Sequence, residues 1–250
     1  MVGKNKIKLI NSLALKKFRD ELKLFVAEGE NVVNELYNLN CVPLYIIGTD
    51  SLLLQKFDCQ TLETDPKTLK SITNLSGNPV IIGVFKIPET VFDVQNLKNK
   101  LTIICHDIQN PGNLGTIIRV CNWFGIENII CSKNSVDCYN HKTVQASSGS
   151  LAGVKIFYED IEETLIKIKD LKINILGTFP KGENIYTCRN INSESVVLFG
   201  NEGSGIPEKY EKYIDYRISI PSFNSNKYVE SLNLSVAASI VISEIKRRSF

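Results

Sequence analysis

The sequence predicts an α/β protein: a C-terminal domain with a mainly parallel sheet, preceded by a smaller α/β unit. Two observations carry this prediction. Short apolar runs alternate with segments of helical periodicity over residues 100–248, which is the pattern of strands joined by crossover helices. The run Leu101–Cys105 is apolar apart from Thr102, as expected for a strand that is covered on both faces.

The first 86 residues predict the smaller unit. Helices are expected over 11–21 and 32–37, and Pro66 directly after Asp65 is typical of a third helix start. This third helix is expected over 65–75. Strands are expected at 43–47, 60–62 and 80–85. Residues 87–99 are mostly polar and contain a proline, which indicates a linker, so that the C-terminal domain covers 100–250.

The C-terminal domain shows a regular alternation of strands and helices. After the strand at 101–105, further strands are expected at 128–131, 155–158, 173–177 and 196–199. Helices are expected at 113–124, 144–150, 161–170 and 232–248. Strands that alternate with helices form a mainly parallel sheet, because each parallel connection needs a crossover.

Composition narrows the class of protein. The chain has 250 residues, 43% of them hydrophobic, and a net charge of +2, which permits a nucleic-acid partner without requiring one. The N-terminus lacks an apolar secretion signal and no window has the length of a membrane span. We therefore expect a cytoplasmic protein without a membrane partner.

Cysteine and histidine usage argues against a metal site. The chain has seven cysteines and two histidines, and no pair of cysteines has the spacing of a CxxC motif. An odd number of scattered cysteines fits buried thiols in a reducing compartment better than a disulfide framework or a zinc site. We expect no metal.

A first candidate motif follows the strand at 101–105. Residues 106–119 contain a Pro-Gly turn, then Asn113 and Arg119. Asn113 suits a helix cap. Six residues on a helix correspond to a rotation of about 600°, so the two side chains point in different directions. From the residue types alone, a helix cap plus an arginine in an ion pair is the more common explanation, because turns and caps often use asparagine.

Two further motifs follow later strands. A glycine-rich loop with one carboxylate, Glu202, follows the strand at 196–199, and its spacing fits neither a phosphate loop nor a dinucleotide fingerprint. Ser231 and Asn233 stand where the last helix begins and backbone N–H groups are free. Taken alone, the first is compatible with a tight turn and the second with a serine cap.

Together these segments resemble the three motifs of the SpoU (TrmH) family of RNA ribose 2′-O-methyltransferases, in the SPOUT superfamily. The pattern Asn-x-Gly-x-x-x-Arg matches residues 113–119, and Gly-Asn-Glu-x-x-Gly matches residues 200–205. Ile-Pro followed by Glu-Ser-Leu-Asn-x-Ser-Val-Ala matches residues 220–221 and 230–237. The resemblance covers roughly residues 100–248. Residues 17–30 also resemble the L30e-like substrate-binding domain that precedes many such domains.

The resemblance implies a fold, a cofactor and an assembly. The C-terminal domain would carry a deep trefoil knot, and residues 1–86 would form an L30e-like RNA-binding domain. The chain would bind S-adenosyl-L-methionine and form a homodimer whose helices near the knot make the interface. The implied cofactor residues are Thr178, Gly200, Ile220 and Leu232.

The resemblance also implies a reaction, 2′-O-methylation of a ribose in ribosomal or transfer RNA, with ribosomal RNA favoured. Arg119 would position the ribose or phosphate and stabilise the developing alkoxide, since arginine is normally always protonated. The implied catalytic residues are Arg119, Asn113, Glu202, Ser231 and Asn233. The stretch between Pro221 and Glu230 departs from the family in being longer and lacking glycine.

Basic residues indicate where RNA would bind. The expected contacts are Lys16, Lys17, Arg19, Lys23 and Lys142. Such contacts give affinity without sequence choice, and a solvated helix face explains these residues about as well.

Two alternatives remain at this point. The chain could be a catalytically silent RNA-binding or ribosome-assembly factor on the same fold. It could also be a nucleotide-dependent oxidoreductase or kinase, although the glycine loop fails both fingerprints.

Overall fold

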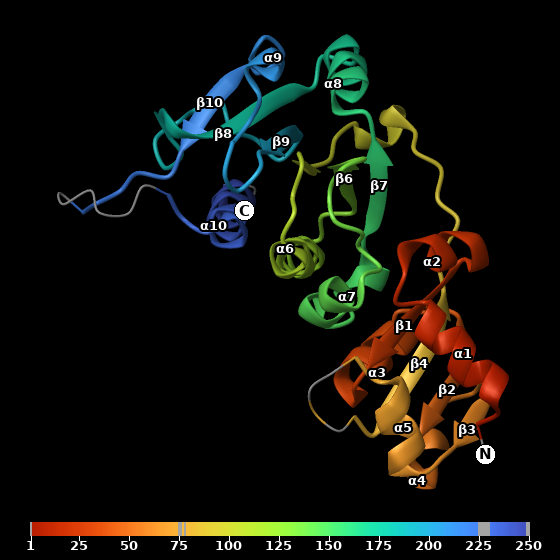
Figure 1. The fold of residues 1–250 in the computed structure, drawn as a ribbon. Coiled ribbons are helices and arrows are strands. Elements are labelled where there is room, and N and C mark those ends of the chain that lie inside the picture. Colours follow the sequence, from red (N-terminus) through yellow and green to blue (C-terminus); the bar gives the residue numbers. More distant parts are fainter. Residues whose placement is uncertain (1, 75–76, 78, 225–230, 249–250) are drawn as a thin grey trace. The chain divides into compact units, whose positions relative to one another are not determined.

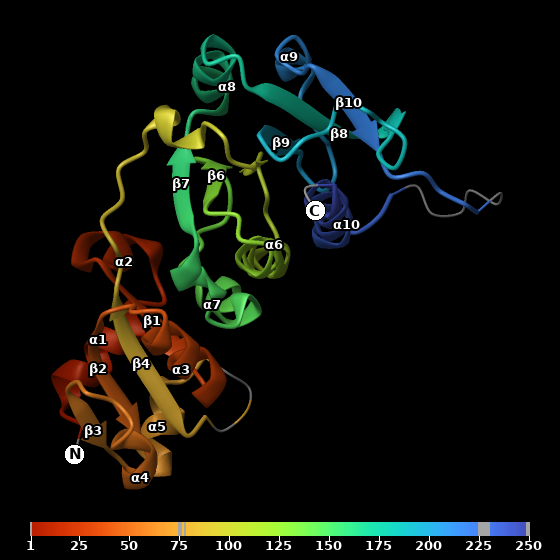
Figure 2. The ribbon, with the colours of Figure 1, turned by 180° about the vertical axis from the view of Figure 1, so that it is seen from behind.

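The computed structural model describes residues 2–74, 77, 79–224 and 231–248. The chain divides into two compact units, which are described separately. The first contains residues 1–89 together with 137–153, and the second contains 90–136 and 154–250. Figures 1 and 2 show the elements from opposite sides.

The first unit is built on a four-stranded mixed sheet with the order β1-β4-β2-β3. Strand β4 pairs antiparallel with β1 and with β2, and β2 pairs parallel with β3. The strands are β1 Leu24–Glu28, β2 Pro43–Gly48, β3 Thr61–Glu63 and β4 Ile81–Lys86. The helices are α1 Lys4–Ser12, α2 Lys16–Leu22, α3 Glu30–Asn38, α4 Ser51–Leu54, α5 Pro66–Ile72 and α7 His141–Ser147, followed by the 3₁₀ helix η2 Ser150–Gly153.

Apolar side chains of α1 and α5 form a core with one face of this sheet. Ile10 of α1 and Leu69 of α5 are buried against strand residues such as Val26 and Ile82. Asp65 accepts a hydrogen bond from the backbone N–H of Thr68, 2.9 Å away, which confirms the predicted start of the helix that contains Pro66.

The prediction of one helix over 11–21 is wrong. The chain leaves α1 at Leu13 and enters α2 after Leu15, whose backbone is extended. The guanidinium of Arg19 donates to the carbonyl oxygens of Leu13 and Ala14, so these groups are satisfied outside a helix. The run 25–27, which the sequence left without an element, lies in strand β1.

The second unit is built on a six-stranded sheet with the order β10-β8-β9-β5-β6-β7, and every neighbouring pair is parallel. This confirms the predicted parallel sheet. The strands are β5 Thr102–Cys105, β6 Asn128–Ser132, β7 Lys155–Glu159, β8 Asn174–Asn184, β9 Ser195–Phe199 and β10 Tyr216–Ser219. The helices are η1 Val94–Leu97, α6 Pro111–Trp123, α8 Ile161–Asp170, α9 Glu208–Glu211 and α10 Leu234–Arg247.

Helices cover both faces of the second sheet. Figure 1 shows α8 and α9 on one side of it and α6 with α10 on the other. On the first side, Ile104 and Leu198 pack with Leu165 of α8. Leu97 of η1 belongs to the same core, so part of the segment predicted as a linker is a packed element. The last helix begins at Leu234, two residues after the predicted start.

Candidate active site

Two of the three sequence motifs begin at the same side of the parallel sheet, where the carboxyl ends of its strands lie. Strands β5 and β9 pair in parallel, with Cys105 opposite Phe199, so both motif loops start at the carboxyl ends of neighbouring strands. The backbone N–H of His106 then donates to the carbonyl oxygen of Phe199 over 2.9 Å. Carboxyl ends of parallel strands are where α/β sheets place their ligand sites.

Asn110, and not Asn113, caps helix α6. The Asn110 side chain accepts hydrogen bonds from the backbone N–H groups of Gly112 and Asn113 at 2.8 and 3.3 Å. Pro111 takes the first helical position, where a missing N–H costs nothing. The prediction of Asn113 as the cap is therefore wrong, and its buried side chain is available for other partners.

Three predicted catalytic residues form one hydrogen-bonded chain. The Asn113 amide donates to the Glu202 carboxylate over 3.1 Å, and the Asn233 amide donates to the Asn113 side-chain oxygen over 3.0 Å. The other contacts of Glu202 come from the backbone N–H groups of Gln109 and Asn110, at 3.4 and 3.3 Å. The structure thus joins one residue from each of the three motifs.

Two helix N-termini contribute to this chain. Asn233 caps α10 by accepting from the backbone N–H groups of Ser235 and Val236 at 3.0 and 3.4 Å. Asn113 lies in the first turn of α6. The N-terminus of a helix carries a partial positive charge, so both ends favour an anion or a developing negative charge nearby.

The glycine loop is a tight turn that presents Glu202. Asn201 and Gly205 exchange backbone hydrogen bonds of 3.0 Å, and a Cβ atom on Gly200 would lie 2.2 Å from the carbonyl carbon of Gly205. The Asn201 side chain donates to the carbonyl oxygen of Asp107 over 2.7 Å and accepts from the backbone N–H of Gly203 over 2.8 Å. Sequence reasoning missed Asn201 as a structural residue, although it lies inside the Gly-Asn-Glu match.

Arg119 and Ser231 lie outside the hydrogen-bonded chain. Both are exposed. Within the part of the chain that the structure describes, no hydrogen bond or ion pair joins either residue to Asn113, Glu202 or Asn233. Residues 225–230, which include Glu230 of the third motif and most of the longer stretch after Pro221, lie outside the described residues.

Of the four predicted cofactor residues, Gly200 and Ile220 directly follow strands β9 and β10, whereas Thr178 lies within β8 and Leu232 precedes α10. Thr178 of β8 donates its hydroxyl to the carbonyl oxygen of Leu198 over 3.1 Å, near the end of β9, and Gly200 directly follows that strand. Ile220 directly follows β10 and is half-buried. Leu232 precedes the cap of α10 and exposes 48% of its surface.

His106 is a packed residue of this edge. Its ring lies edge-on to that of Tyr210, with ring centroids 5.1 Å apart, and burial lowers its pKa while Asp107 opposes the shift. Within the described residues, no group of histidine, cysteine and acidic side chains has an arrangement that could hold a metal ion. No helix in this part of the chain is long and apolar enough to cross a membrane.

The predicted RNA contacts fall into two classes. The side chains of Lys16, Lys17, Lys23 and Lys142 are exposed, and Lys16 pairs with Asp20 over 2.7 Å. Arg19 is buried and paired, so its guanidinium is not presented to a phosphate.

The model of the SpoU rRNA Methylase family matches residues 100–243. The chain belongs to the SpoU rRNA methylase family. This match spans the whole hydrogen-bonded chain from Asn113 to Asn233, so the SpoU motifs and the site geometry coincide.

Three similar proteins extend this SpoU assignment. The 23S rRNA (guanosine(2553)-2′-O)-methyltransferase RlmP of Bacillus subtilis is 24% identical over 96% of both chains. The 23S rRNA (guanosine-2′-O-)-methyltransferase RlmB of Neisseria meningitidis is 32% identical over 74% of this chain and 75% of its own. The crystal structure of an AdoMet-bound rRNA methyltransferase from Sinorhizobium meliloti matches with a TM-score of 0.84 at 24% identity, covering 100% of this chain and 97% of that one.

Proposed function

We propose that this protein transfers a methyl group from S-adenosyl-L-methionine to a ribose 2′-oxygen of structured RNA, with ribosomal RNA favoured over transfer RNA. The observation that carries the proposal is the Asn113–Glu202–Asn233 chain at the carboxyl edge of the parallel sheet. It joins the three motifs through which the sequence resembles the SpoU family. RlmP of Bacillus subtilis and RlmB of Neisseria meningitidis are named as ribosomal RNA 2′-O-methyltransferases, which supports the ribosomal substrate.

The residues at this edge fit an adenosine-containing cofactor. Such a ligand needs apolar walls and a few polar groups that fix its orientation. Ile220 and Leu232 offer apolar surface, while Thr178 and the backbone at Gly200 offer polar groups. When bound, S-adenosylmethionine would supply an activated methyl group on a sulfonium sulfur.

The protein's own residues would prepare the ribose hydroxyl. A hydroxyl is a weak nucleophile, so its developing negative charge must be stabilised. In the proposed reaction the N-terminal ends of α6 and α10 and the guanidinium of Arg119 stabilise that charge. Asn113 and Asn233 orient the ribose, and Glu202 holds Asn113 in place. Ser231 lies beside Asn233 in sequence and is proposed to contact the substrate or the cofactor.

We propose that the enzyme is a homodimer and that Arg119 acts on the partner subunit's site. Arg119 is exposed on α6, and within the described residues it makes no hydrogen bond or ion pair with the Asn113 chain of its own subunit. Helices α6 and α10 pack side by side and expose apolar side chains, Trp123 at 84% and Val236 at 47%. Large exposed apolar side chains on neighbouring helices are typical of a protein interface.

The first unit is proposed to be an L30e-like domain that binds RNA through four lysines, Lys16, Lys17, Lys23 and Lys142. The second unit is proposed to carry a trefoil knot. The exposure of these lysines supports the RNA role. A ribosomal RNA substrate and seven free thiols fit the cytoplasm.

A methyl-transfer assay tests the proposal. Purified protein is incubated with tritiated S-adenosylmethionine and total RNA from a strain that lacks this protein, with ribosomal and transfer RNA separated afterwards. We expect label in ribosomal RNA at one ribose 2′-oxygen. Label in transfer RNA alone would show that the substrate is transfer RNA rather than ribosomal RNA. If S-adenosylhomocysteine binds and no RNA is labelled, the catalytically silent factor is the better description.

A further inference from the structure

The last helix of the second unit makes specific polar contacts at both of its ends. At its start, Asn233 caps α10 and donates to Asn113 in the candidate active site. At its end, the Arg248 side chain is only 18% exposed and pairs with the buried carboxylate of Glu244 over 2.8 Å. Arg248 is therefore held in one geometry at the end of the helix that is remote from Asn113.

The guanidinium of Arg248 joins α10 to a turn that follows β8. Its nitrogens Nη1 and Nη2 donate to the carbonyl oxygens of Cys188 and Ile185, respectively. The turn itself is closed by the backbone N–H groups of Thr187 and Cys188, which donate to the carbonyl oxygen of Asn184 at 3.0 and 2.9 Å. Ile185 and Cys188 are buried, so their carbonyl groups need donors from the protein. The planar arginine fork supplies two donors at once.

The same turn is bonded to the strand that leads to a predicted cofactor residue. The backbone N–H of Ile185 donates to the carbonyl oxygen of Ser219, the last residue of β10, over 2.9 Å. The Ser219 hydroxyl donates back to the carbonyl oxygen of Gly182 over 3.1 Å. Ile220 follows Ser219 by one peptide bond. A continuous series of hydrogen bonds and one covalent step therefore connects Arg248 with Ile220.

Strand β8 departs from regular pairing just before this turn. Its register against β10 breaks between Gly177 and Glu183, so segment 178–182 lies outside the regular strand pairing. Thr178, another predicted cofactor residue, begins the segment, and Arg248 holds the turn that follows it. A bulged stretch of strand has fewer ladder hydrogen bonds to fix it, so the contacts at its ends decide its position.

We propose that Arg248 is a positioning residue for S-adenosylmethionine, which fixes Ile220 and segment 178–182 by holding the turn between β8 and β9. The inference rests on the proposed function. Arg248 acts through Ile185 and Ser219 and does not itself touch the cofactor. Exposed ion pairs add little, but a mostly buried guanidinium that donates to backbone carbonyl groups fixes their geometry. A site that is ordered in advance loses less free energy to ordering when its ligand binds.

Arg248→Lys tests this role, because lysine keeps the positive charge beside Glu244 and lacks the fork that reaches two carbonyl oxygens. We expect the Kd of S-adenosylhomocysteine to rise about tenfold, in the range of ordinary coupling between sites. The KM for S-adenosylmethionine should rise by the same factor, while kcat at saturating cofactor stays at the wild-type value, because only ground-state binding is weakened.

Arg247→Lys is the matched control. Arg247 is adjacent to Arg248 and donates to the same carboxylate of Glu244, at 2.8 and 2.9 Å. Its side chain is 68% exposed, and within the part of the chain that the structure describes its side-chain hydrogen bonds go to Glu244 alone. This variant loses an arginine fork without losing a contact to the turn, so its Kd for S-adenosylhomocysteine should equal that of the wild type.

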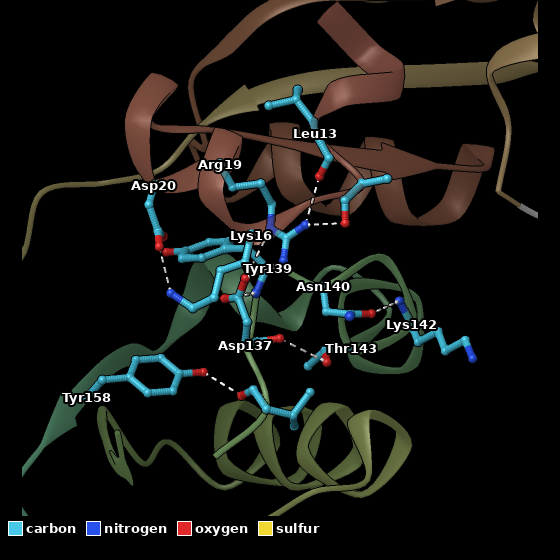
Figure 3. Close-up of polar contacts among 12 residues, drawn as sticks. Leu13, Lys16, Arg19, Asp20, Asp137, Tyr139, Asn140, Lys142, Thr143 and Tyr158 are labelled. Atoms are coloured by element: carbon cyan, nitrogen blue, oxygen red, sulfur yellow. Dashed lines mark hydrogen bonds and ion pairs between the residues drawn. The ribbon is translucent and has the colours of Figure 1, made fainter. Parts of the chain in front are cut away.

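A second control separates positioning from a general loss of stability. In the first unit, Arg19 also donates to two carbonyl oxygens, those of Leu13 and Ala14, while it pairs with Asp137 (Figure 3). Arg19→Lys therefore loses a comparable buried fork in the unit that does not carry the cofactor residues. It should lower the melting temperature and leave the Kd of S-adenosylhomocysteine unchanged.

Amide hydrogen exchange supplies a readout that does not depend on turnover. Coupling between sites is reciprocal, so S-adenosylhomocysteine should slow exchange in residues 185–188 and 218–220 of the wild type. Arg247→Lys should show the same protection, and Arg248→Lys should show less of it at 185–188. Equal protection in all three proteins would contradict the inference.

Binding and transfer together separate this inference from the proposed function. A folded Arg248→Lys protein with the wild-type Kd would overturn the inference even if its melting temperature falls, because that pattern describes a purely structural contact. If Arg248→Lys weakens cofactor binding and the wild type still labels no RNA, the proposed function fails and the positioning role stands. A wild-type protein that binds no S-adenosylhomocysteine would refute both.

Discussion

The side-chain amide of Asn113 donates a hydrogen bond to the carboxylate of Glu202 over 3.1 Å, although 89 positions of sequence separate the two residues. Asn113 is buried in the first turn of α6, and Glu202 stands on the tight loop after β9. Because Asn113 also accepts from Asn233, it is the central member of the site.

Glu202→Gln should lower methyl transfer by about 10²–10³ in kcat, the magnitude seen when a preorganised polar contact is removed. The carboxylate accepts hydrogen bonds through both of its oxygens, from two backbone N–H groups and from the Asn113 amide. A glutamine side chain has only one acceptor oxygen, so it cannot make all three hydrogen bonds. Single-turnover methylation measures the effect, with binding of S-adenosylhomocysteine expected to persist. Glu208→Gln, which removes an exposed carboxylate from nearby α9, should retain full activity.

Arg119→Ala should lose most activity while unfolding at the wild-type temperature, since exposed substitutions usually change stability by less than about 0.5 kcal/mol. If Arg119 serves the partner subunit's site, mixing Arg119→Ala with Asn113→Ala protein should restore activity. Each heterodimer then has one site with both residues intact. Activity that stays absent after verified subunit exchange would place Arg119 in its own subunit's site.

Trp123→Lys should convert the proposed homodimer to a monomer and abolish methyl transfer. The side chain is 84% exposed at the end of α6, so a charge there costs little in the monomer and much in a buried interface. Sedimentation equilibrium measures the assembly. Val91→Lys alters another apolar side chain, 88% exposed, and should leave the dimer intact.

Glu244→Gln should destabilise the second unit at neutral pH by about 1.5–3 kcal/mol, the usual contribution of charged hydrogen bonds. Hydrogen bonds from Arg247 are the main cause that lowers the pKa of Glu244 from 4.5 to about 2, and burial opposes this shift. A depressed pKa stabilises the fold above pH 4.5, and this stabilisation is lost as the pH falls toward 2. The difference in melting temperature between wild type and variant should therefore shrink across that window.

Glu244→Gln also tests how the C-terminal helix α10 is anchored. Arg248 pairs with Glu244 and also donates to the carbonyl oxygens of Cys188 and Ile185. Loss of the Glu244 charge should loosen this anchor, which amide exchange near Cys188 can detect. A melting-temperature difference that does not depend on pH would contradict the electrostatic explanation.

Gly149→Ala should destabilise the first unit more than Gly125→Ala destabilises the second. Both glycines have positive φ, +87° and +64°, so each alanine meets about 1 kcal/mol of backbone strain. A Cβ atom at Gly125 meets no atom within 4 Å, whereas at Gly149 it collides with Glu35. Thermal unfolding measures both, and equal losses would mean that α3 can shift to make room.

Local sequence patterns determined much of the fold. Mostly apolar runs such as 101–105 and 128–131 became strands because such runs are favourable only where both faces are covered. Asp65 before Pro66 fixed a helix start by local hydrogen bonding. The motif match also found Asn113, Glu202 and Asn233, which the structure joins in one hydrogen-bonded chain.

Tertiary contacts decided what local patterns could not. The break at Leu13 depends on Arg19, whose buried partner Asp137 lies 118 residues away. The RNA prediction was therefore wrong for Arg19, which the sequence shows only as part of a basic helix face. Pairing of Asn113 with Glu202 likewise needs two strands to lie side by side in the sheet. Periodicity and capping are short-range effects that the sequence displays directly. The packing of whole elements sets which distant charges and amides come into contact. These contacts are therefore visible only in the tertiary structure.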